Sequence, residues 1–139
     1  MRRACIDANV ILRFLTGEPP EMATQARQLF AAADQGQVVL LLDDIVLAET
    51  VWVLTSFYKL PAIEVTRALL QLLSHEAIHA DDKSLLAEAL QRFSEHNVGF
   101  ADALLATRMR HRGITEVFTF DRHFDRLPGI TRLEPGPVD

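Results

Sequence analysis

Four acidic residues stand where a carboxylate is costly, because each interrupts or ends a run of apolar residues: Asp7, Glu49, Asp102 and Asp121. A buried carboxylate without a partner shifts its pKa and becomes neutral, whereas several that converge stay charged if a cation lies among them. Hard oxygen ligands of this kind favour Mg²⁺ or Mn²⁺. The residue types therefore indicate metal-assisted phosphoryl chemistry.

Each acid also has a plain structural explanation. Asp7, which is followed by Ala8 and Asn9, suits a helix N-cap, and Asp102 suits the first turn of a helix, where the dipole favours an acid. Asp121 suits the start of a turn. Glu49 is harder to explain in this way, because the neighbouring positions on its expected helix are mostly apolar. The joint placement of the four acids favours a functional site over four separate structural roles.

Strands and helices are expected to alternate along the chain. Apolar runs bounded by turn residues predict strands, and apolar residues at helical spacing predict helices. Strands are expected at 3–7, 38–42, 77–80, 116–120 and 130–133, and helices at 9–15, 21–35, 45–58, 62–74, 83–95 and 100–112. This alternation predicts an α/β fold with a parallel sheet and crossover helices.

The expected fold places the four acids near one edge of the sheet. Ligands of open parallel sheets bind at the carboxyl ends of the strands. Asp7 and Asp121 each end a strand, Asp102 lies in the first turn of its helix, and Glu49 lies inside another. This topology allows all four to converge.

Length and composition predict one compact domain. The chain has 139 residues, of which 49% are hydrophobic, so it can bury a core. The single cysteine, Cys5, lies in an apolar run and is expected in that core, which fits a reducing compartment. We see neither a signal peptide nor an apolar run near the roughly 20 residues that span a bilayer, so a cytoplasmic protein is expected.

The formal net charge of −5 argues against a sequence-independent nucleic-acid coat protein. It does not exclude a nuclease, since clustered metal ligands raise the count of acids. Two basic patches matter more, one at 108–112 and one at 122–126. The first is also explained as cations at a helix C-terminus, where they face the dipole.

The segment His75-Glu76-Ala77-Ile78-His79 matches the His-Glu-x-x-His pattern of zinc proteases. That pattern needs one helix running through both histidines, so that they share a face. Here two aspartates follow at once, and the segment is typical of a helix end passing into a strand. No third ligand is evident, so zinc proteolysis is disfavoured.

An aspartyl-phosphate fold is the other alternative, because Asp43 and Asp44 follow a strand as in receiver domains. Such sites need a lysine near the phosphoryl group, and Lys59 and Lys83 are expected far from strand ends. Phosphatases of the haloacid dehalogenase type begin with Asp-x-Asp, whereas Asn9 replaces the second acid here. There is no glycine-rich phosphate loop or nucleophile elbow.

Four segments resemble the PIN-domain family, and specifically the VapC-type toxins of bacterial toxin–antitoxin pairs. They are Ile-Asp-Ala-Asn-Val at 6–10, Leu-Ala-Glu-Thr-Val-Trp-Val-Leu at 47–54, Phe-Ala-Asp-Ala-Leu-Leu-Ala at 100–106 and Thr-Phe-Asp-Arg-His-Phe at 119–124. Each segment is weak alone, but the four in this order are specific. The resemblance spans nearly the whole chain and departs at none of the four acids.

The resemblance implies a single PIN-like domain over residues 1–139, with a three-layer α/β/α sandwich around a central parallel sheet. It implies an Mg²⁺- or Mn²⁺-dependent endoribonuclease whose catalytic, metal-binding acids are Asp7, Glu49, Asp102 and Asp121. Asn9 and Thr119 match positions that support such a site through hydrogen bonds. The implied partners are an RNA substrate, a cognate antitoxin and a second copy of the chain. The alternative is a non-catalytic PIN-fold module that binds or processes RNA.

Two segments carry more apolar side chains than one core face needs: Val10, Ile11, Leu12, Phe14, Leu15, Val51, Trp52, Val53, Leu54, Phe57 and Tyr58. Large exposed apolar patches usually mark interfaces. Part of this surface is therefore expected to be covered by another chain, which fits a homodimer and an antitoxin.

Overall fold

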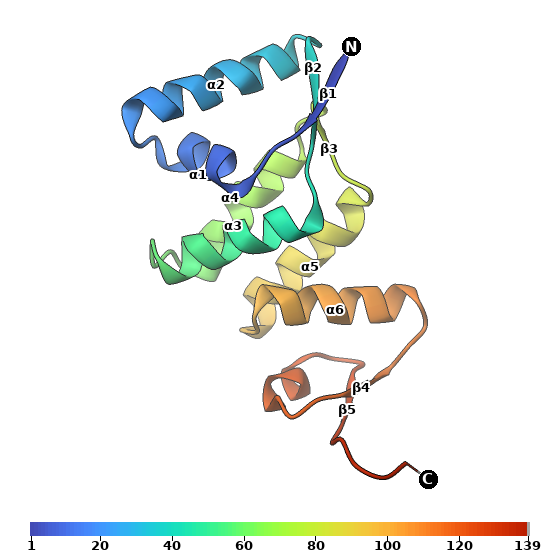
Figure 1. Cartoon of the computed structure of the whole chain (residues 1–139). Helices are drawn as coiled ribbons and strands as arrows, with labels where there is room; N and C mark the ends of the chain where they lie inside the picture. Colours follow the sequence, from blue (N-terminus) through green and yellow to red (C-terminus); the bar gives the residue numbers. More distant parts are fainter. Residues whose placement is uncertain (139) are drawn as a thin grey trace. The chain divides into compact units, whose positions relative to one another are not determined.

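The computed structural model describes residues 1–138, and the fold is α/β with parallel strand pairing (Figure 1). The contacts divide the chain into two compact units, Met1–Lys83 and the part from Ser84 onward. We call these unit 1 and unit 2 and describe each by itself.

Unit 1 is built on a three-stranded parallel sheet of β1 (Arg2–Cys5), β2 (Val38–Leu41) and β3 (Ile78–His79), in the order β1-β2-β3. The register pairs Ala4 with Leu40, and Leu40 with Ile78. Leu40 and Ile78 are among the most buried side chains. This row of side chains marks the face of the sheet that belongs to the core.

Four helices belong to unit 1: α1 (Ala8–Thr16), α2 (Pro20–Asp34), α3 (Asp44–Ser56) and α4 (Ala62–Leu73). Helix α1 packs against α2 and α3, while α2 contacts β2 and α4 contacts β3. Figure 1 shows α1, α2 and α4 on the same side of the sheet. The rings of Phe14 and Phe30, with centroids 4.3 Å apart, join α1 to α2.

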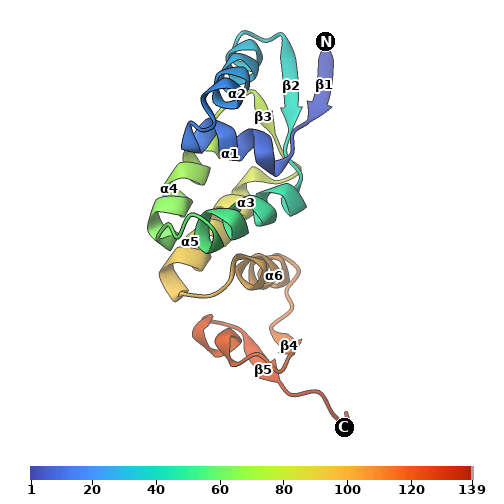
Figure 2. The same ribbon diagram turned by 60° about the vertical axis from the view of Figure 1, so that its left-hand side comes forward.

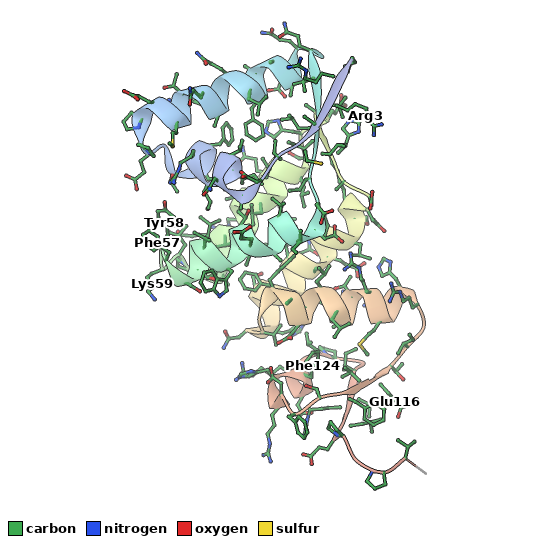
Figure 3. The ribbon with its side chains drawn as sticks, in the orientation of Figure 1. Arg3, Phe57, Tyr58, Lys59, Glu116 and Phe124 are labelled. Atoms are coloured by element: carbon green, nitrogen blue, oxygen red, sulfur yellow. The ribbon has the colours of Figure 1, made fainter. Side chains whose placement is uncertain are left out.

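The other face of the sheet differs from the expectation of fully buried strands. Because successive side chains of a strand point to opposite faces, Ala4 faces the core and Cys5 faces away. Cys5 is exposed, so its expected place in the core is wrong. Leu41 of β2 is only half-buried. This face lines a cavity of about 390 Å³, and Figure 3 shows Arg3 pointing away from α1 and α2.

Unit 2 contains α5 (Lys83–His96, beginning at the boundary), α6 (Phe100–His111), β4 (Glu116–Phe118), the short 3₁₀ helix η1 (Arg122–Arg126) and β5 (Thr131–Leu133). Strands β4 and β5 pair in parallel and lie next to each other in Figure 2.

Side-chain contacts hold the elements of unit 2 together. Phe93 of α5 and Phe100 of α6 meet edge to face with centroids 6.2 Å apart. Phe124, labelled in Figure 3, is the buried residue of η1. The Arg132 Nε donates to the Asp125 Oδ1 at 3.2 Å, which ties β5 to η1 and gives Asp125 a structural role.

The predicted α/β fold with a parallel sheet is confirmed, and every predicted strand and helix is present with bounds shifted by a few residues. Asp7 follows β1 of the three-stranded sheet and Asp121 follows β4 of the two-stranded sheet, so the expectation that both follow strands of one sheet is wrong. The sequence did not predict η1, since the turn after Asp121 carries no helical apolar spacing. Among residues 1–138, no helix combines the length and apolar character needed to cross a bilayer.

Candidate functional site

Asp7 lies at the carboxyl end of β1, where the strand turns into α1. The ladder extends one residue past β1, because the Ile6 amide donates to the Leu41 carbonyl at 3.1 Å. The Asp7 Oδ1 accepts a hydrogen bond from the Val10 amide at 3.2 Å, so Asp7 is the N-cap of α1. Ile6 and Ala8 on either side are buried, which fixes the backbone that carries this exposed carboxylate.

Glu49 lies on α3 between two large apolar side chains that are themselves exposed. Ile45 is 74% exposed and Trp52 is 66% exposed, at one turn before and about one turn after Glu49. The predicted apolar neighbours are therefore present, but they do not bury Glu49, which is exposed. The expectation that all four carboxylates sit in costly positions is wrong for Asp7 and Glu49.

Asp102 is half-buried in the first turn of α6. Gly99, the N-cap residue, supplies no side-chain hydrogen bond to this helix end. Burial raises the pKa of Asp102 above its usual range, the nearby charge of Asp121 raises it further, and His123 acts in the opposite direction. Two carboxyl groups that lie close together and are partly shielded from water repel each other when both are ionised. A bound cation would offset this repulsion.

Asp121 follows β4 and caps η1. Its Oδ1 accepts a hydrogen bond from the His123 amide at 2.8 Å and lies 2.9 Å from the His123 Nδ1. The Asp121 amide donates to the Thr119 Oγ1 at 2.9 Å. Thr119 therefore holds the backbone at Asp121 through a hydrogen bond. The family resemblance implies a supporting role for this same threonine.

Unit 2 thus brings together Asp102, Asp121 and His123, while Asp7 and Glu49 belong to unit 1. Within neither unit do three metal-binding side chains of residues 1–138 come together as a complete site. Asn9 is exposed and lines a groove with residues of α1 and α2, so its supporting role stays a prediction.

Sequence reasoning did not single out His123 as part of the acidic site. The signal was present in the segment at 119–124, where a histidine follows Asp121 by two residues. An aspartate that caps a turn accepts a hydrogen bond from the amide two residues later, which brings that residue close. The 3₁₀ turn of η1 then places the His123 ring against the Asp121 carboxylate.

The two alternative sites do not have the geometry that their chemistry needs. His75 lies in the turn after α4 and His79 lies on β3, so the two histidines do not share a helix face. Asp43 caps α3 by accepting from the Ile45 amide at 3.0 Å, and the Lys83 Nζ donates to the His75 carbonyl at 2.8 Å. These contacts give Asp43 and Lys83 structural roles instead of a shared phosphoryl site.

The chain is similar to known proteins over nearly its whole length. It is 29% identical over 130 residues to the VapC ribonuclease of Aquifex aeolicus (strain VF5), an alignment that covers 94% of this chain and 95% of that protein. The family model described as the PIN domain matches residues 4–130, which include all four acids. The chain therefore belongs to the PIN domain family.

Proposed function

We propose that this protein is a metal-dependent endoribonuclease, the toxin component of a VapC-type toxin–antitoxin pair, and that it acts in the cytoplasm on RNA phosphodiester bonds. The observation that carries the proposal is the carboxyl pair of Asp102 and Asp121, where burial and like charge raise the pKa of Asp102. The similarity to a VapC ribonuclease supports the same activity.

The donor set fits Mg²⁺ or Mn²⁺, since all four acids offer carboxylate oxygens, and burial and the like charge of Asp121 raise the pKa of Asp102. Asp7 and Asp102 would hold the ion directly, while Glu49 and Asp121 would bind it through water or orient the attacking water. When bound, such an ion lowers the pKa of water and stabilises the charge that develops on the phosphorus centre. Thr119 holds the backbone of Asp121, and Asn9 would support Asp7.

The proposal requires acids from both units to act on one substrate. Asp7 and Glu49 come from unit 1, and Asp102 and Asp121 come from unit 2. We propose that residues 1–139 act as a single PIN-like domain in which the four acids face one phosphate. The family model supports this, since its match runs from residue 4 to residue 130 across both units.

The function is tested by incubating the purified full chain with RNA and mapping the new 5′ and 3′ ends by sequencing. We expect cleavage with Mg²⁺ or Mn²⁺, none after EDTA, and full activity under a chelator selective for zinc. The His75→Ala and His79→Ala variants serve as controls and should cleave like the unchanged chain. Neither histidine is close in sequence to a proposed acid, and neither lies on a helix or strand that carries one. RNA binding without cleavage under every metal condition would favour the non-catalytic module instead.

The proposed partners are a second copy of the chain and an antitoxin. Of the apolar side chains expected at a partner surface, Trp52 and Phe57 are exposed, whereas Ile11, Leu12, Val51 and Leu54 are buried in the core. Further exposed apolar side chains are Ile45 on α3 and, near the start of α4, Leu60 and Ile63. The rings of Phe57 and Tyr58, labelled in Figure 3, meet edge to face with centroids 5.0 Å apart. Burying such side chains against a partner stabilises the complex through the hydrophobic effect.

We expect the chain to sediment as a homodimer at tens of micromolar, about the range where a modest interface holds. Trp52→Glu should shift it toward the monomer, because the charge would be buried in the interface. Sedimentation of the unchanged chain as a monomer at these concentrations would contradict the homodimer.

A further inference from the structure

Unit 2 contains a cavity of about 370 Å³ that the acidic site does not use. It is lined by Arg92 of α5, by α6 and the loop that follows it, and by the segment 127–130. Five of the lining side chains are apolar: Ala106, Ile114, Leu127, Pro128 and Ile130. Its volume lies in the range of small-ligand pockets, about 300–1,000 Å³.

Two guanidinium groups line this cavity, from Arg92 and Arg110, and its lining residues include no carboxylate. Arg92 is already engaged, because its Nη1 donates to the Glu88 Oε2 at 2.7 Å and to the Thr107 Oγ1 at 2.8 Å. The hydrogen bond from Arg92 lowers the pKa of Glu88, so this pair stays ionised at neutral pH.

Arg110 is exposed, and its side chain makes no hydrogen bond or ion pair within residues 1–138. A guanidinium keeps its charge at every physiological pH and binds phosphate through two parallel hydrogen bonds. The cavity therefore combines apolar side chains with the exposed guanidinium of Arg110, which also lines a neighbouring pocket with Glu88 and Glu95.

The cavity lies along the same ridge of α6 as the proposed acidic site. Asp102, Ala106 and Arg110 follow one another at intervals of four residues, and such residues are neighbours on a helix surface. Ala106 and Arg110 both line the cavity. From Asp102 to Arg110 the helix rises about 12 Å, at about 1.5 Å per residue. An RNA strand that runs along α6 would thus span the distance from Asp102 to Arg110 with a few nucleotides.

We propose that this cavity binds one nucleotide of the RNA substrate, with its phosphate on Arg110 and its base or ribose against Ile114 and Ile130. The inference rests on the proposed function and adds to it a second contact that positions the RNA away from the scissile bond. A single-stranded nucleotide fits both parts of the cavity, since every phosphate carries a negative charge and every base has an apolar face.

The test measures the affinity of full-length variants for a fluorescent single-stranded RNA by anisotropy, in the Asp7→Asn background so that the RNA stays intact. We expect Arg110→Gln to weaken binding roughly tenfold, as for loss of one charge-assisted contact. The slope of log affinity against log salt should become shallower by about 0.7, the value for one phosphate contact on a single strand. The Ile114→Ser variant should weaken binding with an unchanged slope, since it removes only apolar contact.

Arg112→Gln is the matched control, because Arg112 is an exposed arginine at the end of the same helix and does not line the cavity. It should change affinity less than Arg110→Gln. With Asp7 intact, Arg110→Gln should raise the KM for RNA and leave kcat nearly unchanged, because it acts on binding and not on the reacting phosphate.

Equal losses in the Arg110 and Arg112 variants would overturn the proposal, since they would show only a general effect of surface charge. Unchanged RNA affinity in a folded Arg110→Gln variant would also overturn it and would favour a protein partner as the occupant. If the unchanged chain cleaves RNA while either result is found, the cavity assignment fails and the proposed function stands. If it neither binds nor cleaves RNA, both fail together.

Discussion

Asp7→Asn is expected to abolish RNA cleavage while leaving the fold and its stability unchanged. The loss should exceed about 100-fold, because even residues that only orient metal ligands cost 10–100-fold when they are replaced. The Asp7 Oδ1 caps α1 by accepting from the Val10 amide. Asparagine caps a helix about as well as aspartate, so the free energy of unfolding should change by only a few tenths of a kcal/mol.

Asp7→Ala separates the two roles of this residue. It should lose cleavage to the same degree and also lose about 1 kcal/mol of stability, because alanine cannot cap the helix. Cleavage rates and urea unfolding curves of the three proteins check this. A folded Asp7→Asn protein that cleaves RNA at the unchanged rate in Mg²⁺ would remove Asp7 from the site.

Asp102→Asn is expected to stop cleavage and to stabilise the metal-free protein. Burial and the charge of Asp121 raise the pKa of Asp102 in the folded chain. A raised pKa means that the ionised carboxylate destabilises the fold at a pH above the folded-state pKa. Below the ordinary value of 3.8 the group is protonated in both states, and the cost disappears. Asparagine carries no charge and avoids this cost.

Unfolding in metal-free buffer between pH 3.5 and pH 7 measures the effect. The Asp102→Asn variant should be more stable than the unchanged chain at pH 7, with an advantage that fades as the pH approaches 3.8. Glu116→Gln, which removes an exposed carboxylate of the same unit, should give no such trend. Excess Mn²⁺ should reverse the order, because only the unchanged chain gains stability from the bound ion. A stability difference between Asp102→Asn and the unchanged chain that does not depend on pH would contradict the raised pKa of Asp102.

The order of strands and helices could be predicted because the apolar patterns are long and end at clear signals. Gly36 and Gly113, for example, each stand two residues after the end of a helix, just past the C-cap residue, and adopt positive φ angles. Burial was harder to predict. Cys5 lies in an apolar run, yet it is exposed because β1 is an edge strand whose alternate side chains face away from the core helices.

For the candidate site, the place of each acid along its strand or helix could be predicted, but not which side chains meet. The positions of Asp7 and Asp121 after strands follow from sequence, as does Asp102 in the first turn of a helix. The electrostatic contact of Asp102 with Asp121 depends on how α6 meets the loop after β4, which no local pattern encodes. His123 was missed for the same reason, because its place depends on a 3₁₀ turn without helical apolar spacing.

Mn²⁺ binding tests the central claim most directly, namely that acids from both units form one metal site. Free Mn²⁺ is followed by electron paramagnetic resonance as it is titrated into the unchanged chain, Asp7→Asn from unit 1 and Asp102→Asn from unit 2. Far-ultraviolet circular dichroism confirms that each variant is folded. We predict that the unchanged chain binds Mn²⁺ and that each variant alone loses that binding, because both carboxylates hold the same ion. Binding that survives either substitution unchanged would contradict a shared site.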